Sequence, residues 1–156
     1  MNDHQPEAKR PNRARLVVRN QDATTGDLES FVDAFAAAHD LAREDALRTT
    51  IVLEELLTNL WKYGYPDHHL PAGEAQITLE LHDERLTIEF ADDGQAFDPL
   101  SGPPPDLDQS VEVRSPGRLG LHIAREFMDE ALYDRRDGRN VVRLSRRVTL
   151  IKRQDS

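Results

Sequence analysis

The stretch Ile51–Tyr65, IVLEELLTNLWKYGY, decides how the rest of this chain is organised. No Pro or Gly occurs in the range 41–63, and strong helix formers are spread through it, which predicts a central helix over about 43–63. Gly64 and Pro66 follow directly and are typical of a helix C-terminus. The chain therefore has one long helix at its centre.

The central helix has one apolar and one polar face when successive residues are turned by about 100°. Glu55 and Asn59 fall together on the polar face, one helical turn apart. An acid and a carboxamide in this arrangement often lie in solvent without a further role, so their meaning depends on the motifs that follow. The face expected to enter the core consists of Val52, Leu53, Leu56, Leu57, Leu60 and Trp61.

Composition narrows the class of protein. The chain has 156 residues, enough for one domain with its own core, and no Cys, so it has neither disulfides nor thiolate metal sites. Its formal charge of −9 argues against a general nucleic-acid binder. No apolar run of about 18 residues and no signal-peptide pattern occurs, so we expect a soluble, cytoplasmic protein without a membrane partner.

The remaining periodicities predict short strands and two further helices. Strands and helices follow one another as strand, helix, helix, hairpin, long loop, helix and hairpin. This order favours an α+β fold, a two-layer α/β sandwich with a mostly antiparallel mixed sheet and helices on one face. The expected elements are a strand at 15–19, a helix from 25 or 27 to about 41, a hairpin at 76–90, a helix at 117–129, and a hairpin joining 131–134 to 140–150 through Asp137–Gly138.

Asp92 follows the alternation of the strand before it. Leu86, Ile88 and Phe90 share one face of that strand, and Asp92 continues the same phase. A carboxylate on the apolar side is costly unless a donor meets it. The alternative is that the strand ends at Ala91 and that Asp92 turns to solvent.

Two kinds of segment lack periodicity. Pro99–Pro116 contains five prolines and is a long loop, of the kind that often forms a functional lid. Residues 1–13 and 151–156 are polar tails, so the expected domain spans 14–150. The pairs Arg135–Arg136 and Arg146–Arg147 flank hairpin strands; we interpret them as charges that protect sheet edges, with contact to an acidic partner as the alternative.

Three motifs occur in order along the chain: Glu55-x-x-x-Asn59, Asp92-x-Gly94-x-x-Phe97-Asp98-Pro99 and Gly117-Arg118-Leu119-Gly120-Leu121. In order and rough spacing they resemble the ATP-binding domain shared by histidine kinases, type II topoisomerases and the large heat-shock chaperone. Within that superfamily the chain is most similar to the small stand-alone anti-sigma-factor serine/threonine kinases. The resemblance covers about 14–150, and ADDGQAFDP is its most specific part.

The resemblance implies a role for each motif. Glu55 would be the catalytic base for an incoming hydroxyl, and Asn59 would bind Mg²⁺ through its side-chain oxygen. Asp92 would accept a hydrogen bond from the adenine amino group of ATP. Pro99–Pro116 would be the lid over the phosphates. The N–H groups and the dipole at the start of the third helix would stabilise the negative charge of these phosphates. The further nucleotide-binding residues would be Gly94, Phe97, Gly117, Arg118, Leu119, Gly120 and Leu121.

Arg118 departs from the family pattern, which has a second glycine at this position. An Arg does not adopt a positive φ at low cost, so the lid end differs in shape; the side chain either contacts phosphate or points to solvent. Because of this departure, ATP binding is a firmer expectation than turnover.

The implied function is an ATP- and Mg²⁺-dependent kinase that phosphorylates an anti-anti-sigma protein on Ser or Thr and sequesters a sigma factor. The family often forms homodimers. The alternative is a catalytically inactive nucleotide-binding module that regulates a partner by sequestration. A weaker alternative is a histidine-kinase catalytic domain acting in trans.

Overall fold

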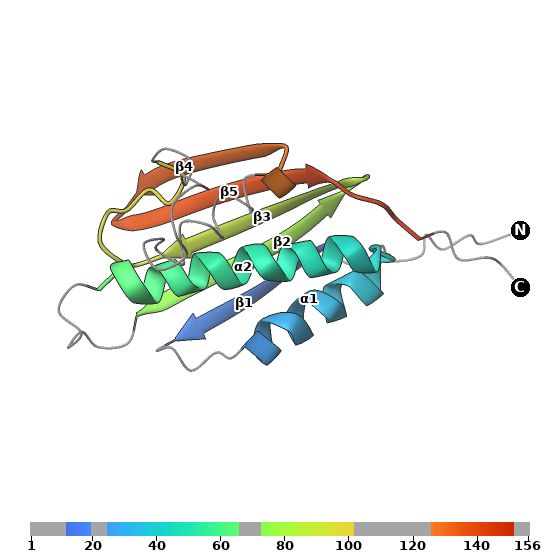
Figure 1. The fold of residues 1–156 in the computed structure, drawn as a ribbon, viewed down its shortest axis with the longest axis horizontal. Coiled ribbons are helices and arrows are strands. Elements are labelled where there is room, and N and C mark those ends of the chain that lie inside the picture. Colours follow the sequence, from blue (N-terminus) through green and yellow to red (C-terminus); the bar gives the residue numbers. More distant parts are fainter. Residues whose placement is uncertain (1–11, 20–24, 66–72, 102–125, 152–156) are drawn as a thin grey trace, which may run out of the picture.

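The computed structural model describes residues 12–19, 25–65, 73–101 and 126–151. Five strands form one sheet in the order β1-β2-β3-β5-β4, and each neighbouring pair is antiparallel. Two helices lie side by side over one face of this sheet (Figure 1). The elements are β1 (Arg13–Arg19), α1 (Thr25–His39), α2 (Arg43–Tyr63), β2 (Glu74–His82), β3 (Arg85–Asp92), β4 (Glu130–Arg136) and β5 (Arg139–Arg147).

This architecture confirms the expected α+β two-layer fold. The described strands contain no parallel pair, so the sheet is fully antiparallel rather than mixed in the part of the chain that the structure shows. No helix among the described residues is both long and apolar enough to cross a membrane. Predictions for 1–11, for the lid beyond Ser101 and for Gly117–Leu121 lie outside the described residues.

Helix α2 has the bounds predicted from its sequence, and its apolar face forms the centre of the core. Val52 and Leu53 are fully buried, and Leu56, Leu57 and Leu60 are nearly so. The sheet supplies the other half of the core through alternate residues of β2, β3 and β5, and α1 adds Leu28, Val32 and Phe35. Each fully buried side chain of this size contributes about 1.5–3 kcal/mol to folding.

Both hairpins join their strands through residues with left-handed backbone. Asp83 has φ 54° between β2 and β3, and Asp137 and Gly138 have φ 51° and 74° between β4 and β5. Two consecutive positive φ angles are the signature of a type I′ turn, whose twist matches that of antiparallel strands. The Asp137–Gly138 turn predicted from the sequence is therefore confirmed.

The C-terminal end of β5 differs from the prediction. The strand ends at Arg147, whereas alternation predicted a strand to Leu150. The backbone then leaves the sheet: the Val148 N–H donates to the Glu84 carbonyl over 2.8 Å, and Leu150 makes an isolated bridge with Leu41. These contacts draw the chain toward the α1–α2 junction, which periodicity alone does not reveal.

Arg146 is not an edge charge, which corrects the interpretation of the Arg146–Arg147 pair. Its strand, β5, lies between β3 and β4. The Arg146 guanidinium donates to the Phe127 carbonyl over 2.9 Å, and its Nε lies 3.6 Å from Oδ1 of the buried Asp45. Arg135 and Arg136, in contrast, do lie on the edge strand β4.

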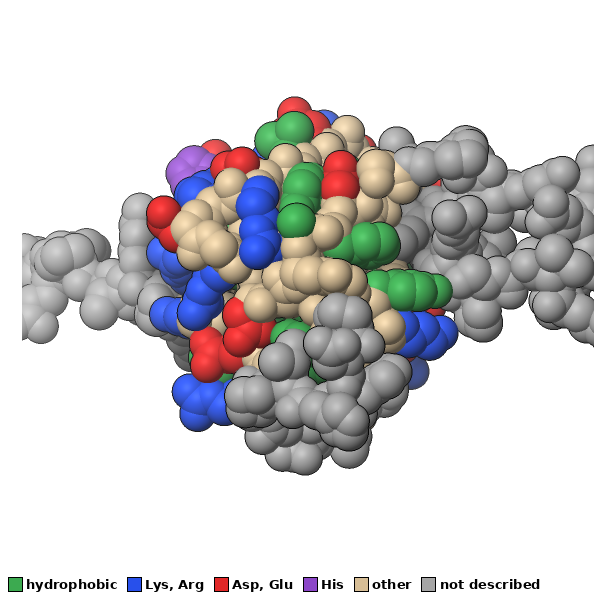
Figure 2. Space-filling model, turned by 90° about the vertical axis from the view of Figure 1, so that its left-hand side faces the viewer, with side chains coloured by type: hydrophobic (Ala, Val, Ile, Leu, Met, Phe, Trp, Pro, Cys, Tyr) green, Lys and Arg blue, Asp and Glu red, His purple; other side chains and the backbone are tan. Residues whose placement is uncertain are grey.

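The face of the sheet opposite the helices carries charges of both signs. Arg19 and Arg139 approach Glu74 at 3.2 and 3.9 Å, and Arg143 approaches Glu89 at 4.0 Å. In Figure 2, Lys and Arg side chains gather on the left of the view with Asp and Glu side chains among them. Such exposed pairs contribute little stability each, about 0–1 kcal/mol, but they keep this face polar.

The predicted third helix is described only at its end. Glu126 and Phe127 are helical, and the helix stops before Met128, two residues earlier than the predicted limit. Phe127 and Met128 pack against the core, and the Arg48 guanidinium lies 5.6 Å from the centre of the Phe127 ring.

Candidate functional site

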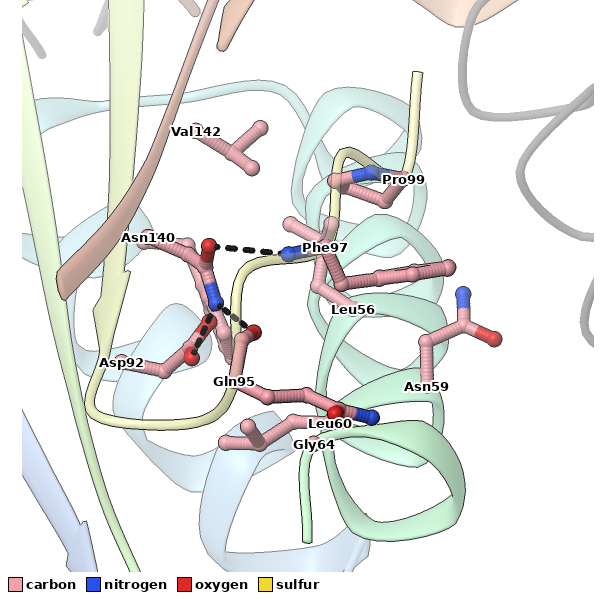
Figure 3. Close-up of a pocket in the computed structure, with 11 residues that line it drawn as sticks. Leu56, Asn59, Leu60, Gly64, Asp92, Gln95, Phe97, Pro99, Asn140 and Val142 are labelled. Atoms are coloured by element: carbon pink, nitrogen blue, oxygen red, sulfur yellow. Dashed lines mark hydrogen bonds between the residues drawn. The ribbon is translucent and has the colours of Figure 1, made fainter. Parts of the chain in front are cut away.

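A pocket lies between the C-terminal half of α2, the end of β3 and the start of β5 (Figure 3). Its empty volume, including the open space at its mouth, is about 320 Å³. A mostly apolar wall with a few polar groups is typical of small-molecule sites. The lining residues are Leu56, Asn59, Leu60, Gly64, Phe90, Asp92, Gln95, Phe97, Pro99, Asn140 and Val142.

Asp92 lies inside this pocket, on the buried side of β3. It is 7% exposed, so the interpretation in which it turns to solvent is wrong. The Gly94 N–H and the Asn140 Nδ2 donate to its Oδ1 over 2.9 and 3.0 Å. Burial raises the pKa of the Asp92 carboxyl, while these two hydrogen bonds oppose the shift. Both described hydrogen bonds end on Oδ1, which leaves Oδ2 as an acceptor for a ligand.

Asn140 is the functional residue that the motifs did not identify. It is 3% exposed, and besides Asp92 it donates to the Gln95 carbonyl over 2.8 Å. Its Oδ1 accepts from the Phe97 N–H and from the Tyr133 hydroxyl, at 3.2 and 2.6 Å. Figure 3 shows this carboxamide at the centre of the loop that follows β3. One side chain thus holds the whole Asp92–Phe97 motif against β5.

A signal for Asn140 was present in the sequence. Alternation in β5 places Asn140 in phase with the buried Val142 and Leu144. A carboxamide on a buried face requires several partners, because its donors and acceptor would otherwise be left unsatisfied. A buried polar residue in phase with a core strand is therefore a candidate site residue even where no motif covers it.

The loop after β3 also closes the C-terminal end of α2. The Gln95 N–H donates to the Gly64 carbonyl over 2.9 Å, and the Gln95 side chain donates to the Tyr63 carbonyl over 2.6 Å. Carbonyl groups at a helix end lack partners within the helix, so these bonds supply them. Arg135 on β4 donates to the Gly94 carbonyl over 2.8 Å and fixes the loop from the other side.

Gly94 and Gly64 are required by space rather than by unusual backbone angles. A Cβ on Gly94 would lie 3.0 Å from Asp92 Oδ1 and 3.1 Å from both the Gly64 Cα and the Leu60 Cδ1. Gly64 itself has φ −75°, so it ends α2 in right-handed geometry, and a Cβ there would lie 2.6 Å from the Leu60 carbonyl oxygen. The two motifs can pack this closely because both positions lack a side chain.

Asn59 lies in the pocket wall, so the alternative in which it is a solvent-exposed side chain without a further role is wrong. It is 3% exposed, and its Nδ2 is buried without a hydrogen-bond partner. Glu55, one turn earlier, is half-buried and is not part of the pocket lining, and its Oε2 is also buried without a partner. Groups of this kind are costly in a folded protein unless a ligand completes them.

The pKa of the Glu55 carboxyl is raised above its usual value. Burial is the main cause, the nearby Lys62 opposes it, and Glu54 adds to it. A half-buried carboxylate with a raised pKa and an unpartnered oxygen is suited to accepting a proton from a substrate, because it is a stronger base than a carboxylate in solvent.

Phe97 and Pro99 form the outer wall of the pocket, where the predicted lid begins. Phe97 is 38% exposed and stacks on Tyr63 with 5.7 Å between ring centres. Asp98 fixes the next turn, because its Oδ1 accepts from the Leu100 N–H over 2.8 Å. An exposed aromatic pair at the mouth of a pocket gives a flat apolar surface for a ring system.

The residues fit a magnesium nucleotide. Among the described residues, no group of three or more His, Cys, Asp or Glu side chains is arranged to hold a metal ion. A Mg²⁺ ion does not need such a group, because it keeps several waters and shares phosphate oxygens, so the Asn59 carboxamide is an adequate protein ligand. Of the predicted residues, Asn59, Asp92 and Phe97 line this pocket. Gly94 is joined to it by its hydrogen bond to Asp92, and Glu55 lies outside the lining, one helical turn before Asn59. Residues 117–121 fall outside the described residues.

Comparisons with known proteins point in the same direction. A family model described as histidine kinase-like ATPase domain matches residues 18–146. The serine/threonine-protein kinase BtrW of Bordetella bronchiseptica is 35% identical over 101 residues, which cover 64% of this chain and 70% of that protein. The serine-protein kinase RsbW of Bacillus cereus is 31% identical over 93 residues, 57% of this chain and 56% of that protein. The chain thus spans little more than half the length of the RsbW relatives.

Proposed function

Since the chain belongs to the family of histidine kinase-like ATPase domains, we propose that it is an ATP-dependent protein serine/threonine kinase that acts as an anti-sigma regulatory factor. One observation carries the proposal: Asp92 and Asn59 line the same pocket, where Oδ2 of Asp92 can accept from a nucleotide and the unpartnered Nδ2 of Asn59 can donate to one. The kinase names of BtrW and RsbW support the reaction class.

The base of the nucleotide would bind at Asp92. Its Oδ2 accepts from the amino group of adenine, while Asn140 and the Gly94 N–H hold Oδ1 in place. Phe97 and Leu60 provide apolar contact for the ring. Asn59 would hold Mg²⁺ through its carboxamide oxygen on the side of the pocket away from β5.

Bound MgATP supplies the phosphoryl group. The hydroxyl oxygen of a Ser or Thr forms the new bond to the γ-phosphorus, the bond from that phosphorus to the bridging oxygen of ADP breaks, and ADP leaves. Glu55 accepts the hydroxyl proton, directly or through a water molecule. Because Glu55 lies one helical turn from Asn59, a single helix, α2, would carry both the base and the metal ligand.

The substrate would be an anti-anti-sigma protein, and the sequestered partner would be a sigma factor. Both follow from the resemblance of the motifs to the stand-alone anti-sigma kinases, as do a possible homodimer and a cytoplasmic location. Arg118 would contact the phosphates in place of the usual glycine.

Calorimetric titration of MgATP into the wild type, Asn59→Ala and Asp92→Ala tests the pocket. We expect binding by the wild type and a loss of at least about tenfold in both variants, since each removes a specific polar contact. No binding by the wild type, or equal binding by all three proteins, would contradict the nucleotide assignment.

Transfer of radiolabel from ATP to an anti-anti-sigma protein tests the reaction. Label on Ser or Thr, lost when the acceptor residue is replaced by Ala, supports kinase activity. ATP binding with no transfer to any such protein would instead identify the chain as a nucleotide-dependent sequestering module.

A further inference from the structure

A groove separate from the nucleotide pocket runs between α1 and α2. Its empty volume is about 1,500 Å³. The α1 wall begins at Glu29 and follows the helical spacing i, i+4, i+7 and i+8, with Asp40 just past the helix. The α2 wall begins at Arg43 and follows i, i+3, i+4, i+7, i+8 and i+11. The groove uses the N-terminal half of α2, to Glu54, whereas the pocket uses its C-terminal half from Leu56. The two sites can therefore be occupied at the same time.

The floor of this groove is apolar and partly open to solvent. Leu47 is 61% exposed and Ile151 is 55% exposed, although both are large hydrophobic residues. The helices run side by side here without a covering element among the described residues (Figure 1). A contiguous exposed apolar strip of this kind marks an interaction site more often than chance exposure does. The apolar lining consists of Ala36, Ala37, Leu41, Ala46, Leu47, Ile51 and Ile151.

The rim of the groove is acidic. Its carboxylates are those of Glu29, Asp33, Asp40 and Glu54, and its cationic residue is Arg43. An apolar floor between carboxylates complements a segment that has apolar side chains on one side and Lys or Arg on its flanks. The shape, a channel between two helices, suits an amphipathic helix that places residues i, i+3, i+4 and i+7 on the floor.

We infer that the α1–α2 groove is a docking site for a basic amphipathic helix of a partner protein. A second copy of this chain is a poor occupant, because a two-fold interface would place the acidic rim of one copy against that of the other. The inference goes beyond the proposed kinase reaction, since none of its residues belongs to the nucleotide pocket.

Fluorescence anisotropy with a labelled peptide tests this inference. The peptide carries Leu at i, i+3, i+4 and i+7 positions and Lys elsewhere. One control peptide has the same composition in an order without an apolar helix face, and another has Glu in place of Lys. We expect the wild type to bind the basic amphipathic peptide at least about tenfold more tightly than either control.

Matched variants of the protein locate the binding. Leu47→Lys places a charge on the floor, and Leu132→Lys makes the same change on β4 at a side chain that is 63% exposed. We expect Leu47→Lys to weaken peptide binding by about tenfold or more and Leu132→Lys by less than about twofold. An unchanged urea unfolding midpoint for Leu47→Lys shows that the variant is folded and keeps this result independent of the kinase proposal.

Three outcomes would overturn the inference. The first is an equal loss of peptide affinity in Leu47→Lys and Leu132→Lys. The second is that the wild type binds the control peptide without an apolar face as tightly as the basic amphipathic peptide. The third is a wild-type dimer in sedimentation velocity that Leu47→Lys converts to a monomer, because the groove would then be occupied by a second copy.

Discussion

Asn140 donates a hydrogen bond to Asp92 across two adjacent strands, with 3.0 Å between Nδ2 and Oδ1. The two residues are direct partners in the register of β3 and β5. Because Asn140 also bonds to the loop at Gln95 and Phe97, the orientation of the Asp92 carboxylate and the path of that loop are fixed together. The acceptor that would meet adenine is thus preorganised by a neighbour outside the sequence motifs.

Replacing Asn140 tests this arrangement. Asn140→Ala leaves Asp92, the Gln95 carbonyl and the Phe97 N–H without their partner, so we expect a loss of about 1–3 kcal/mol in the free energy of unfolding and much weaker ATP binding. Asn140→Asp keeps the shape of the side chain but sets a second carboxylate beside Asp92. At neutral pH we therefore expect it to lose at least as much unfolding free energy and ATP affinity as Asn140→Ala. Urea unfolding and calorimetry measure both quantities. Wild-type ATP affinity in both variants would contradict the positioning role.

Replacing Asp92 with Asn should separate stability from binding. The Asn oxygen can still accept from Gly94 and Asn140, but its amide then faces the adenine amino group donor to donor. We therefore expect ATP binding to fall by at least about tenfold while the free protein remains folded. Calorimetry and urea unfolding at pH 7 measure the two effects, and unchanged ATP affinity would remove Asp92 from the adenine site.

The same substitution has a predictable pH dependence. The pKa of Asp92 is raised in the folded protein, so between its unfolded pKa, about 3.9, and its folded value the folded state binds more protons. The contribution of Asp92 to stability is therefore full below the unfolded pKa and is lost as pH rises through the folded pKa. The amide introduced by Asp92→Asn does not titrate, so the stability of this variant relative to wild type should increase from about pH 4 to about pH 7. A difference that shrinks over this range would contradict the assignment.

Glu55→Gln should reduce transfer without reducing nucleotide binding. The amide keeps the size of the side chain but cannot take the hydroxyl proton, which typically costs about 10²- to 10⁴-fold in rate. Since Glu55 does not line the pocket, the Kd for MgATP should stay within about threefold. Glu80→Gln on β2 makes the same chemical change on the opposite face of the sheet and should leave transfer intact. Parallel loss of binding and transfer in Glu55→Gln would argue against a catalytic base.

Gly94→Ala should harm both stability and ATP binding. The new Cβ would meet Asp92 Oδ1 and the Gly64 backbone at 3.0–3.1 Å, and overpacking of this kind costs about 1–3 kcal/mol. Gly138→Ala is a matched control: its Cβ meets nothing within 4 Å, but its φ of 74° makes Ala unfavourable by about 1–2 kcal/mol. Both variants should unfold more readily, and only Gly94→Ala should lose ATP affinity. Equal ATP affinity in the two variants would show that the Gly94 contact is not part of the site.

The sequence predicted the elements with strong periodicity. Helix α2 has the bounds expected from Arg43–Tyr63, because a long run without Pro or Gly leaves few alternatives to a helix. The burial of Leu86, Ile88, Phe90 and Asp92 follows from alternation in one strand. The Asp137–Gly138 hairpin follows from turn chemistry. The resemblance carried by the three motifs agrees with the family match over residues 18–146.

Other features required the folded chain. The helical wheel placed Asn59 on the polar side of α2, yet in the folded chain it is buried, in the wall of a pocket that Phe97 and Asp92 also line. The end of β5 at Arg147 depends on contacts with Glu84 and Asp45, which are distant in sequence. Periodicity describes one element at a time and contains no information about which element covers it.

The sequence by itself determined the helix, the hairpins, the two-layer class and the motif residues Glu55, Asn59 and Asp92, because local spacing and turn chemistry act within one element. Only the tertiary structure decided that Asn140 orients Asp92, that Gln95 closes α2, and that the N-terminal half of α2 forms a second groove with α1. These relations join residues that are distant in sequence, or faces of different elements. Their partners are fixed by packing of the sheet against the helices rather than by spacing along the chain.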